Sequence, residues 1–233
     1  MYTKPPVLTP RLLKVASLVK PCSCFADIGT DHAYLPVFLC MTGVCSTAIA
    51  SDIEKGPLAR AERTLNQYGL EDKIQLRLGA GLDTLNPGEA DTIAISGMGG
   101  IVISNILQAG REKLTESTNL ILQPMTSIPE LREFLWEKGW EICRELLAKE
   151  DEKIYNIIMV SPTQSNIEPK PTPAQLYLGR HIIENKPEHY EEYLDKHKGK
   201  IEKMIKGLEA SQSEASKNKL EYCKSLLKEI EKI

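Results

Sequence analysis

The stretch Phe25-Ala-Asp-Ile-Gly-Thr-Asp-His-Ala-Tyr-Leu-Pro36 decides how this chain folds. An apolar run ends at Asp27, and Gly29 follows it. A residue without Cβ lets the backbone turn sharply and lets a ligand approach closely. Because helical sequence begins at Tyr34, we predict a ligand-binding turn between a strand and a helix.

The same alternation of short apolar runs and amphipathic stretches continues to about residue 160. It is typical of repeated strand-helix units and a mostly parallel sheet. After Gly139, two apolar runs flank a charged turn, which indicates a closing antiparallel hairpin. The predicted strands are Cys24–Ile28, Thr47–Ser51, Lys73–Leu78, Asp91–Ser96 and Asn119–Leu122, followed by the hairpin strands Trp140–Leu147 and Ile154–Val160. The predicted helices are Tyr34–Met41, Pro57–Tyr68, Ile101–Ala109 and Ile128–Lys138.

A proline-rich linker, Ser161–Pro173, ends this pattern, because prolines at that density stop regular structure. Beyond it, Ala174–Ile183 has a helical pattern. From Tyr190, apolar residues recur in steps of three and four and form a narrow stripe along a predicted helix. The stripe returns after a polar turn at Ala210–Lys217. We therefore predict two domains, 1–162 and 163–233, the second containing a coiled-coil-like helical hairpin. The stripe consists of Tyr190, Leu194, His197, Ile201, Met204, Ile205 and Leu208, then Leu220, Cys223, Leu227 and Ile230.

Composition narrows the class of protein. The 233 residues have a net charge of -3, with 42% hydrophobic and 26% charged side chains, so the chain is neither disordered nor globally basic. Residues 1–164 carry a net charge of −4 and residues 165–233 a net charge of +1. No apolar run is long enough to cross a membrane, and the N-terminus lacks an apolar signal segment, so we expect a cytoplasmic protein. Lysines at 196, 198, 200, 203 and 206 form either a solvated helix face or a patch that follows phosphates.

We expect no metal site. Six cysteines are present, but the pair Cys22-Ser-Cys24 has no second pair or histidine doublet at zinc-ligand spacing. Small residues leading into a strand explain the pair better than metal binding or redox chemistry.

The turn after the first strand indicates the kind of cofactor. The dinucleotide fingerprint G-x-G-x-x-G is absent, because Asp31 and His32 occupy the positions of further glycines. An aspartate would repel a pyrophosphate, whereas it can accept hydrogen bonds from an ammonium group or a hydroxyl. The sequence therefore disfavours NAD and favours S-adenosylmethionine, which has no phosphate and carries an ammonium and a sulfonium.

Residues after the next two strands extend this candidate site. Asp52 follows the second strand, where an acid can take both hydroxyls of an adenosine ribose; its alternative role is to cap a helix. Gly79-Ala-Gly81, after the third strand, is either an ordinary turn or a flexible one against an adenine ring. Ser96-Gly-Met-Gly-Gly100, after the fourth strand, has three glycines in four positions and is interpreted as a binding loop for a planar substrate.

Four motifs in this order, DIGTDHAYLP, SDIEKGP, GAGLDTL and SGMGG, resemble the bacterial tRNA (adenine-22-N1)-methyltransferase family, TrmK. The resemblance covers nearly the whole chain. It implies a class I methyltransferase domain that is Rossmann-like, with a seven-stranded, mostly parallel sheet, followed by a small helical, coiled-coil-like domain that contacts tRNA. It also implies S-adenosylmethionine as the cofactor and tRNA as the partner.

The chain departs from the general class I pattern at three places. The turn after the first strand has fewer glycines, and Ala80 stands where an acid is often found. Ser96-Gly-Met-Gly replaces the Asp/Asn-Pro-Pro-aromatic motif of many enzymes that methylate amino groups. These departures match the TrmK pattern, but they make the transfer of catalytic detail from other methyltransferases unsafe.

The resulting hypothesis is methyl transfer from S-adenosylmethionine to N1 of one adenine in tRNA. Positioning supplies most of the rate, and a paired or stacked adenine must first be extruded. Methylation leaves a cationic adenine, which Asp31 would stabilise; the equal alternative is that Asp31 binds the cofactor ammonium. The predicted catalytic group is Asp31, Ser96, Gly97, Met98 and Tyr34, with Tyr34 available for stacking. The predicted cofactor-binding group is Arg11, Asp27, Gly29, Asp31, His32, Asp52, Ile53, Ala80, Gly81 and Ser96.

Some roles stay open at this point. His32 is either a cap or packing residue or a member of the site, and Arg11 reaches either tRNA phosphates, with Lys14 and Lys20, or the cofactor carboxylate. A class I methyltransferase acting on another RNA, a protein or a small molecule is one alternative function. A nonenzymatic RNA-binding protein with the same fold is the other. The oligomeric state is not fixed by the sequence, with a monomer favoured.

Overall fold

The computed structural model describes residues 4–164, 169–210 and 213–233. The chain forms two compact units, Met1–Glu168 and Pro169–Ile233. The sequence prediction placed the boundary between domains after residue 162. Part of its linker, residues 165–168, lies outside the described residues.

The first unit is built on a seven-stranded sheet with the order β3-β2-β1-β4-β5-β7-β6. β1 to β5 run parallel, and β7 is antiparallel to both β5 and β6. The predicted seven-stranded, mostly parallel sheet is therefore confirmed, as is the closing hairpin. The strands are β1 (Cys22–Ile28), β2 (Cys45–Asp52), β3 (Ile74–Leu78), β4 (Thr92–Gly99), β5 (Asn119–Thr126), β6 (Trp140–Glu150) and β7 (Lys153–Gln164).

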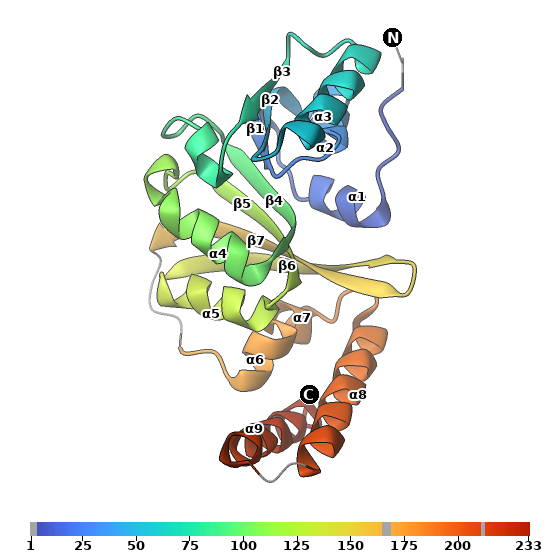
Figure 1. Ribbon diagram of the computed structural model, residues 1–233, viewed down its shortest axis with the longest axis vertical. Helices are drawn as coiled ribbons and strands as arrows, with labels where there is room; N and C mark the ends of the chain where they lie inside the picture. The colour runs from blue at the N-terminus through green and yellow to red at the C-terminus, as the bar shows by residue number, and fades with distance from the viewer. Residues whose placement is uncertain (1–3, 165–168, 211–212) are drawn as a thin grey trace. The chain divides into compact units, whose positions relative to one another are not determined.

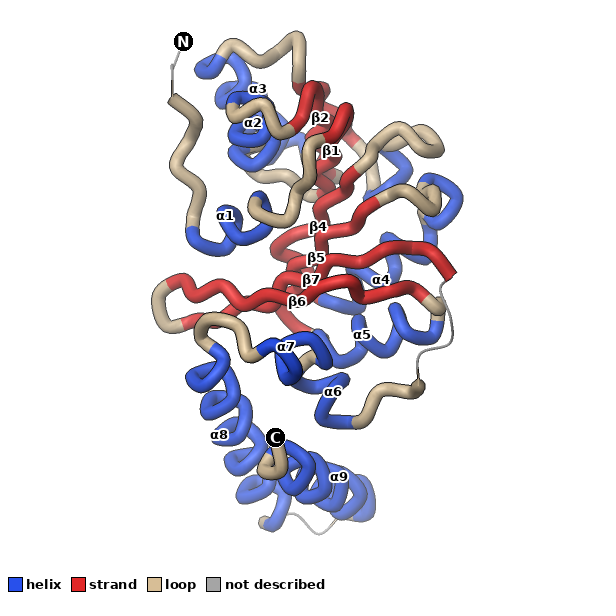
Figure 2. Tube along the Cα trace, turned by 180° about the vertical axis from the view of Figure 1, so that it is seen from behind, coloured by secondary structure: helices blue, strands red, loops and turns tan. Residues whose placement is uncertain are grey.

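Helices cover both faces of this sheet (Figures 1 and 2). α1 (Pro10–Ala16), α2 (Tyr34–Met41) and α3 (Lys55–Tyr68) lie on one face, and α4 (Gly100–Ala109) and α5 (Ile128–Glu137) lie on the other. Two short 3₁₀ helices, η1 (Gly81–Thr84) and η2 (Arg111–Lys113), complete the unit. The sheet is thus the middle of three layers, which is the doubly wound arrangement.

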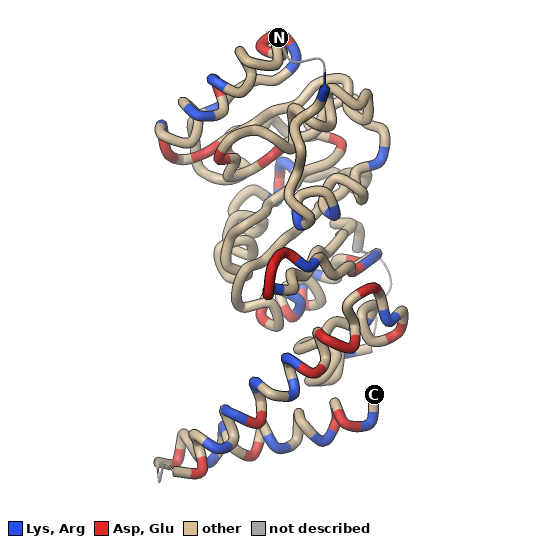
Figure 3. Tube along the Cα trace, turned by 90° about the vertical axis from the view of Figure 1, so that its right-hand side faces the viewer, with Lys and Arg blue, Asp and Glu red and all other residues tan. Residues whose placement is uncertain are grey.

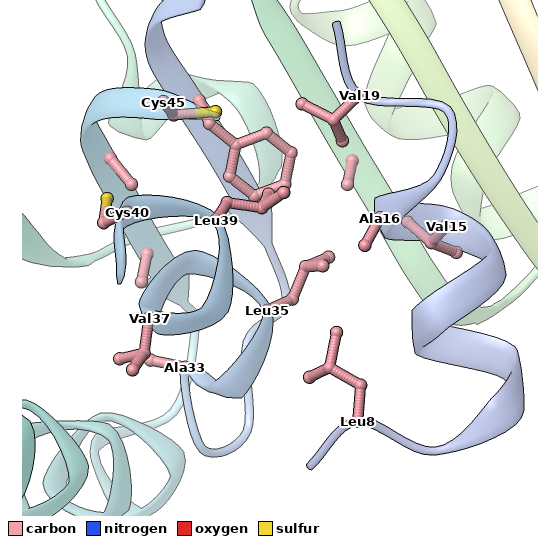
Figure 4. Close-up of a cluster of buried hydrophobic side chains, with 14 of the residues drawn as sticks. Leu8, Val15, Ala16, Val19, Ala33, Leu35, Val37, Leu39, Cys40 and Cys45 are labelled. Carbon is pink, nitrogen blue, oxygen red and sulfur yellow. The ribbon is translucent and has the colours of Figure 1, made fainter. Parts of the chain in front are cut away.

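Each face of the sheet has its own apolar core, because successive side chains of a strand point to opposite faces. In β1, Phe25 belongs to the core under α1 to α3, and Ala26 to the core under α4 and α5. Figure 4 shows the first core, where Leu35 of α2 lies between that helix and the Leu8 and Ala16 side chains of the N-terminal segment. The N-terminal segment is therefore packed into the domain beside the first strand-helix turn.

The structure corrects several predicted boundaries. β4 continues to Gly99, so the segment predicted to be a loop after Ser96 is an irregular end of the strand. β7 continues to Gln164, into the predicted linker, because its backbone pairs with β6 over that length. The helix predicted at Ala174–Ile183 is two helices, since Gly179, with φ 101°, separates α6 (Pro173–Leu178) from α7 (Arg180–Asn185).

The second unit is a small helical assembly rather than a hairpin alone. α8 (Tyr190–Glu209) packs on α9 (Glu214–Ile230), and α6 also contacts α9. The Tyr193 hydroxyl donates to the Leu178 carbonyl oxygen at 3.0 Å, and the Glu229 carboxylate accepts from the Ala174 N–H. Within the predicted stripe, Ile201 and Ile230 are fully buried, whereas Met204, near the far end of α8, is exposed. The stripe is therefore buried over part of its length only. None of the described helices is both long and apolar enough to cross a membrane.

Candidate active site

The predicted site residues meet at the carboxyl edge of the parallel strands. Ile28 of β1 pairs with Ser51 of β2 and with Ile95 of β4, and Ser96 pairs with Gln123 of β5. The segments that follow these four strands therefore share one edge of the sheet. In doubly wound folds, this edge is where ligands bind.

Asp27 is a buried carboxylate at the end of β1. Burial raises its pKa from 3.8 to about 6; a hydrogen bond from Thr30 opposes this shift, and the negative charge of Asp52 adds to it. Because the Thr30 hydrogen bond offsets only part of the cost of burying this carboxylate, the site suits a ligand that brings positive charge or hydrogen-bond donors.

Gly29 brings the first turn against the segment after β4. Its φ is +80°, and a Cβ placed on it would lie 2.1 Å from Cε of Met98. The positive φ favours glycine, because L side chains rarely adopt this conformation, and a Cβ here would push aside the end of the flexible Met98 side chain. The structure thus brings together one residue predicted to bind the cofactor and one predicted to be catalytic.

Asp31, His32 and Tyr34 form a partly exposed cluster at the start of α2. Arg60 of α3 donates to Oδ1 of Asp31 through Nε, at 2.7 Å, and through Nη2. Nε2 of His32 lies 3.4 Å from Oδ2 of Asp31. The His32 ring also stacks on Tyr34, with the centroids 5.3 Å apart and the planes 6° apart. Asp31 therefore already has a cationic partner, Arg60, that the sequence interpretation did not connect with it.

Asp52 and Ile53 follow β2. Oδ1 of Asp52 accepts from the backbone N–H of Glu54 at 2.7 Å, and Glu54, not Asp52, is the N-cap residue of α3. The alternative helix-cap role of Asp52 is therefore wrong for this helix. Ile53 is 66% exposed, which leaves an apolar side chain beside this carboxylate for a ligand to cover.

Ala80 and Gly81 follow β3 and begin the 3₁₀ helix η1. A Cβ on Gly81, where φ is +50°, would lie 3.0 Å from Cγ2 of Ile106 on α4. Leu82 is buried in the core below. The Ile106 contact explains the small residue at Gly81 by packing, whereas Ala80 is exposed, and the predicted role of Ala80 and Gly81 against an adenine stays a prediction.

The end of β4 is shaped by its neighbour β5. The register shifts between Ser96 and Met98, and Gly97 has φ +79°. Oε1 of Gln123, a fully buried side chain, accepts from the Gly97 N–H at 3.0 Å and from Nη1 of Arg11 at 2.5 Å. Arg11 is thus placed beside Gly97. The sequence interpretation missed Gln123; its only signal is a polar residue before proline at the end of an apolar strand, Asn119-Leu-Ile-Leu-Gln-Pro124.

The glycines of the Ser96–Gly100 segment serve different purposes. A Cβ on Gly100 would lie 2.1 Å from the backbone oxygen of Ser127, so this position needs glycine to let α4 pack beside the start of α5. Gly97, by contrast, is exposed. Part of the predicted binding loop is therefore explained by packing, and its Ser96–Met98 part lies at the edge.

The edge fits the cofactor that the sequence favours. The hydroxyl oxygens of Ser51 and Ser96 are buried, and neither has a hydrogen-bond partner among the residues that the structure describes. Two such hydroxyls at the same edge of the sheet as the buried Asp27 carboxylate suit a ligand with ammonium, hydroxyl and amide groups. Within the described ranges, no three His, Cys, Asp or Glu side chains gather as a metal site would require. The expectation of no metal stays a prediction.

The sheet order and the strand-end site together define a class I methyltransferase fold. The family model described as "tRNA (adenine(22)-N(1))-methyltransferase", TrmK, matches residues 25–232. The chain belongs to this family.

Individual relatives agree with this assignment. The tRNA (adenine(22)-N(1))-methyltransferase of Bacillus subtilis is 41% identical over 152 residues, which are 65% of this chain and 64% of the relative, just under two thirds of its length. The crystal structure of the B. subtilis M1A22 tRNA methyltransferase TrmK superposes with a TM-score of 0.87 at 32% identity, covering 96% of this chain and 98% of that one. A Streptococcus pneumoniae structure, named as a candidate tRNA (m1A22) methyltransferase in complex with S-adenosyl-L-methionine, gives a TM-score of 0.81 at 32% identity, covering 95% of this chain and 100% of that one.

Proposed function

We propose that this protein transfers a methyl group from S-adenosylmethionine to N1 of adenine 22 in tRNA. The observation that carries the proposal is the family match over residues 25–232, joined to a ligand-binding edge at the strand ends. The B. subtilis relative is described as acting at adenine 22 of tRNA.

The residues at the edge suit S-adenosylmethionine, with which the S. pneumoniae relative was solved. Asp27, Asp52 and the hydroxyl of Ser96 would hold its polar groups, and Gly29 lets it approach the backbone. When bound, this cofactor supplies a methyl group on a positively charged sulfur. The remaining proposed contacts are Arg11, Asp31, His32, Ile53, Ala80 and Gly81.

The chain's own task is to place the adenine. N1 lies on the Watson-Crick edge, so a paired or stacked base must leave its helix before it can react. The His32 and Tyr34 rings are stacked and Tyr34 is 41% exposed, so they offer an aromatic surface for a base. Ser96, Gly97 and Met98 would orient the base, because backbone groups at this irregular strand end are within reach of a planar ligand.

Asp31 has two candidate roles, stabilising the cationic product or binding the cofactor ammonium. Its pairing with Arg60 supports a carboxylate that stays ionised and fixed in place. The substitution Asp31→Ala separates the roles when cofactor affinity and turnover are both measured. Weak cofactor binding with normal turnover at saturation would reject the catalytic role. Asp83→Ala, an exposed aspartate on η1, is the matched control.

The function itself is tested with purified protein, labelled S-adenosylmethionine and unmodified tRNA, followed by mass spectrometry of the nucleosides. We expect 1-methyladenosine with tRNA that has adenine at position 22, and none when that adenine is replaced by guanine. If the assay yields no 1-methyladenosine, the result favours a methyltransferase that acts on another substrate. If calorimetry detects no binding of S-adenosylmethionine, the result favours the nonenzymatic RNA-binding alternative.

We also propose that residues 163–233 are the arm that contacts tRNA and that 1–162 is the catalytic domain. Exposed lysines on α8, among them Lys200 and Lys203, support this division of labour. We further propose that the protein is a monomer and that it acts in the cytoplasm, where its tRNA substrate is found. Sedimentation of the purified chain with and without tRNA checks the monomer.

A further inference from the structure

The β4–β5 pair changes its register where the candidate base-binding segment begins. Ser96 pairs with Gln123 and Met98 with Pro124, so Gly97 is the extra residue of a bulge. Pro124 has no N–H to donate to the neighbouring strand. The bulge removes the Gly97 N–H from the ladder between the strands, so this N–H takes another acceptor.

Gln123 provides that acceptor from its side chain. Its Oε1 accepts from the Gly97 N–H at 3.0 Å, and its Nε2 donates to the Pro124 carbonyl oxygen at 3.1 Å and lies 3.4 Å from Sδ of Met125. The side chain is fully buried, and both of its amide atoms are used. Reversing the amide would place an NH₂ group against two donors, the Gly97 N–H and Arg11, so the oxygen faces Gly97.

The same oxygen holds Arg11. Nη1 of Arg11 donates to it at 2.5 Å, the Arg11 N–H lies 3.3 Å from Oε2 of Glu150, and the guanidinium lies 5.6 Å from the centre of the Tyr155 ring. A Cβ on Gly97 would be 3.9 Å from the same Nη1. One amide oxygen therefore fixes the position of a strand-end backbone at Gly97 and of a cation from α1, Arg11, which lies 112 residues before Gln123 in the chain.

We propose that Gln123 is the positioning residue of the methyl-transfer site. Through Gly97 it sets the shape of Ser96–Met98, and through Arg11 it sets a positive charge beside that segment. This inference rests on the proposed function. Gln123 acts mainly on the placement of the base, because its side chain bonds, among the described residues, only with α1, β4 and β5. Of the proposed cofactor contacts, Arg11 and Ser96 lie on these elements, whereas Asp27, Gly29 and Asp52 lie at the ends of β1 and β2.

The test compares Gln123→Met, which keeps the length but loses both hydrogen-bonding groups, with Gln123→Glu, which keeps an oxygen toward Gly97 and Arg11 and loses only the donor to the Pro124 carbonyl oxygen. Gln108→Met, on the exposed surface of α4, is the matched control. Three quantities are measured on the full chain: kcat and KM for tRNA, the S-adenosylmethionine Kd by calorimetry, and hydrogen exchange of the Gly97 amide in the protein without cofactor.

For Gln123→Met we expect kcat to fall by about 10- to 100-fold, the cofactor Kd to change less than about threefold, and the Gly97 amide to exchange faster. For Gln123→Glu we expect kcat within about threefold of wild type and slow Gly97 exchange. The control should match wild type in all three. Retention of kcat in Gln123→Met, or loss of cofactor affinity by the same factor as kcat, would overturn the inference.

Two further outcomes are decisive. If Gln123→Met does not fold, slow Gly97 exchange in Gln123→Glu supports the inference and fast exchange overturns it. If wild-type protein forms no 1-methyladenosine, the proposed function fails, while the exchange comparison still decides whether Gln123 holds the bulge.

Discussion

At the scale of single residues, Asp27 makes the folded state sensitive to pH. Its pKa is raised from 3.8 to about 6 by burial, so the folded chain binds this proton more tightly than the unfolded chain does. Between these two values the folded state therefore loses stability as the pH rises. The full effect corresponds to roughly 3 kcal/mol, on the order of 1.4 kcal/mol for each pKa unit.

We therefore expect Asp27→Asn to be more stable than wild type at pH 7.5, and expect this advantage to shrink as the pH falls to 4. Urea unfolding of both proteins at several pH values measures it. The comparison cancels the effect of other titrating groups. One of these is Glu89, whose pKa is lowered from 4.5 to about 2 by its hydrogen bonds with Arg77 and whose contribution to stability is lost as the pH falls from about 4.5 towards 2. An advantage that does not depend on pH would contradict the burial of a charge at Asp27.

Gly29 combines a backbone constraint with a steric one, and a matched control separates the two. We expect Gly29→Ala to weaken cofactor binding by more than about tenfold, because the new Cβ would displace Met98 at the edge. Gly139 also has a positive φ, +67°, but a Cβ there meets nothing within 4 Å. Gly139→Ala should cost only the backbone strain, about 1 kcal/mol of stability, with normal cofactor affinity in calorimetry. Equal affinity losses in the two variants would show that the Met98 contact is unimportant.

At the scale of elements, a buried ion pair joins α5 to the hairpin of β6 and β7. Nε of Arg132 donates to Oε1 of Glu145 at 2.8 Å, and its Nη2 donates to Oδ1 of Asn156 at 2.9 Å. All three side chains are buried. Removing the cation leaves a buried carboxylate without its charge partner, which is far more costly than losing an exposed pair.

Arg132→Met is therefore expected to lower the free energy of unfolding by about 3 to 5 kcal/mol. Arg144→Met, at an exposed position next to Glu145 on β6, should change it by less than about 1 kcal/mol. Denaturant unfolding of the two variants and wild type gives both values. Equal, small changes would mean that Arg132 is stabilised mainly by its packing.

The elements also show how far sequence could predict this protein. α2 has the predicted bounds, Tyr34–Met41, because its apolar run and the preceding turn agree locally. The extension of β4 through Gly99 was missed, because three glycines in four positions normally indicate a loop, and only pairing of Met98 and Gly99 with β5 continues the strand. The break at Gly179 was missed because a lone glycine is tolerated in a helical pattern.

Site residues could be predicted from the sequence where a single segment places them at the edge of the sheet. They could not be predicted where their role depends on contact between segments that lie far apart in the chain. Asp27, Gly29 and Asp52 lie at or directly after the ends of β1 and β2, so their place at the edge comes from the strand order. Gln123 has a role only because a bulge in β4 leaves a donor that β5 must satisfy, and Arg60 meets Asp31 only because α3 packs near the first turn. Neither relation is visible in the spacing of residues along the chain.

At the scale of the whole molecule, the N-terminal and C-terminal parts of the chain carry different net charge. Residues 1–164 have a net charge of −4 and residues 165–233 a net charge of +1, with five lysines between 196 and 206. Acidic and basic residues alternate along the long helices of the second unit (Figure 3). Net charge alone therefore says little about tRNA binding, and the position of individual lysines on the helix matters more.

Lys200 and Lys203 are exposed, and they lie three residues apart on one face of α8, away from the buried Ile201. If this face contacts phosphates, the double substitution Lys200→Gln and Lys203→Gln releases fewer counterions on binding. We expect tRNA affinity to fall and the slope of log K against log salt to become shallower by about 1 to 2 units, with the S-adenosylmethionine Kd unchanged. Lys228→Gln with Lys232→Gln, two exposed lysines near the end of the chain, is the matched control. Filter binding over a series of salt concentrations decides the matter: an unchanged slope in the α8 variant would mean that this lysine face is only solvated, and that the tRNA is held by other basic groups such as Arg63 on α3.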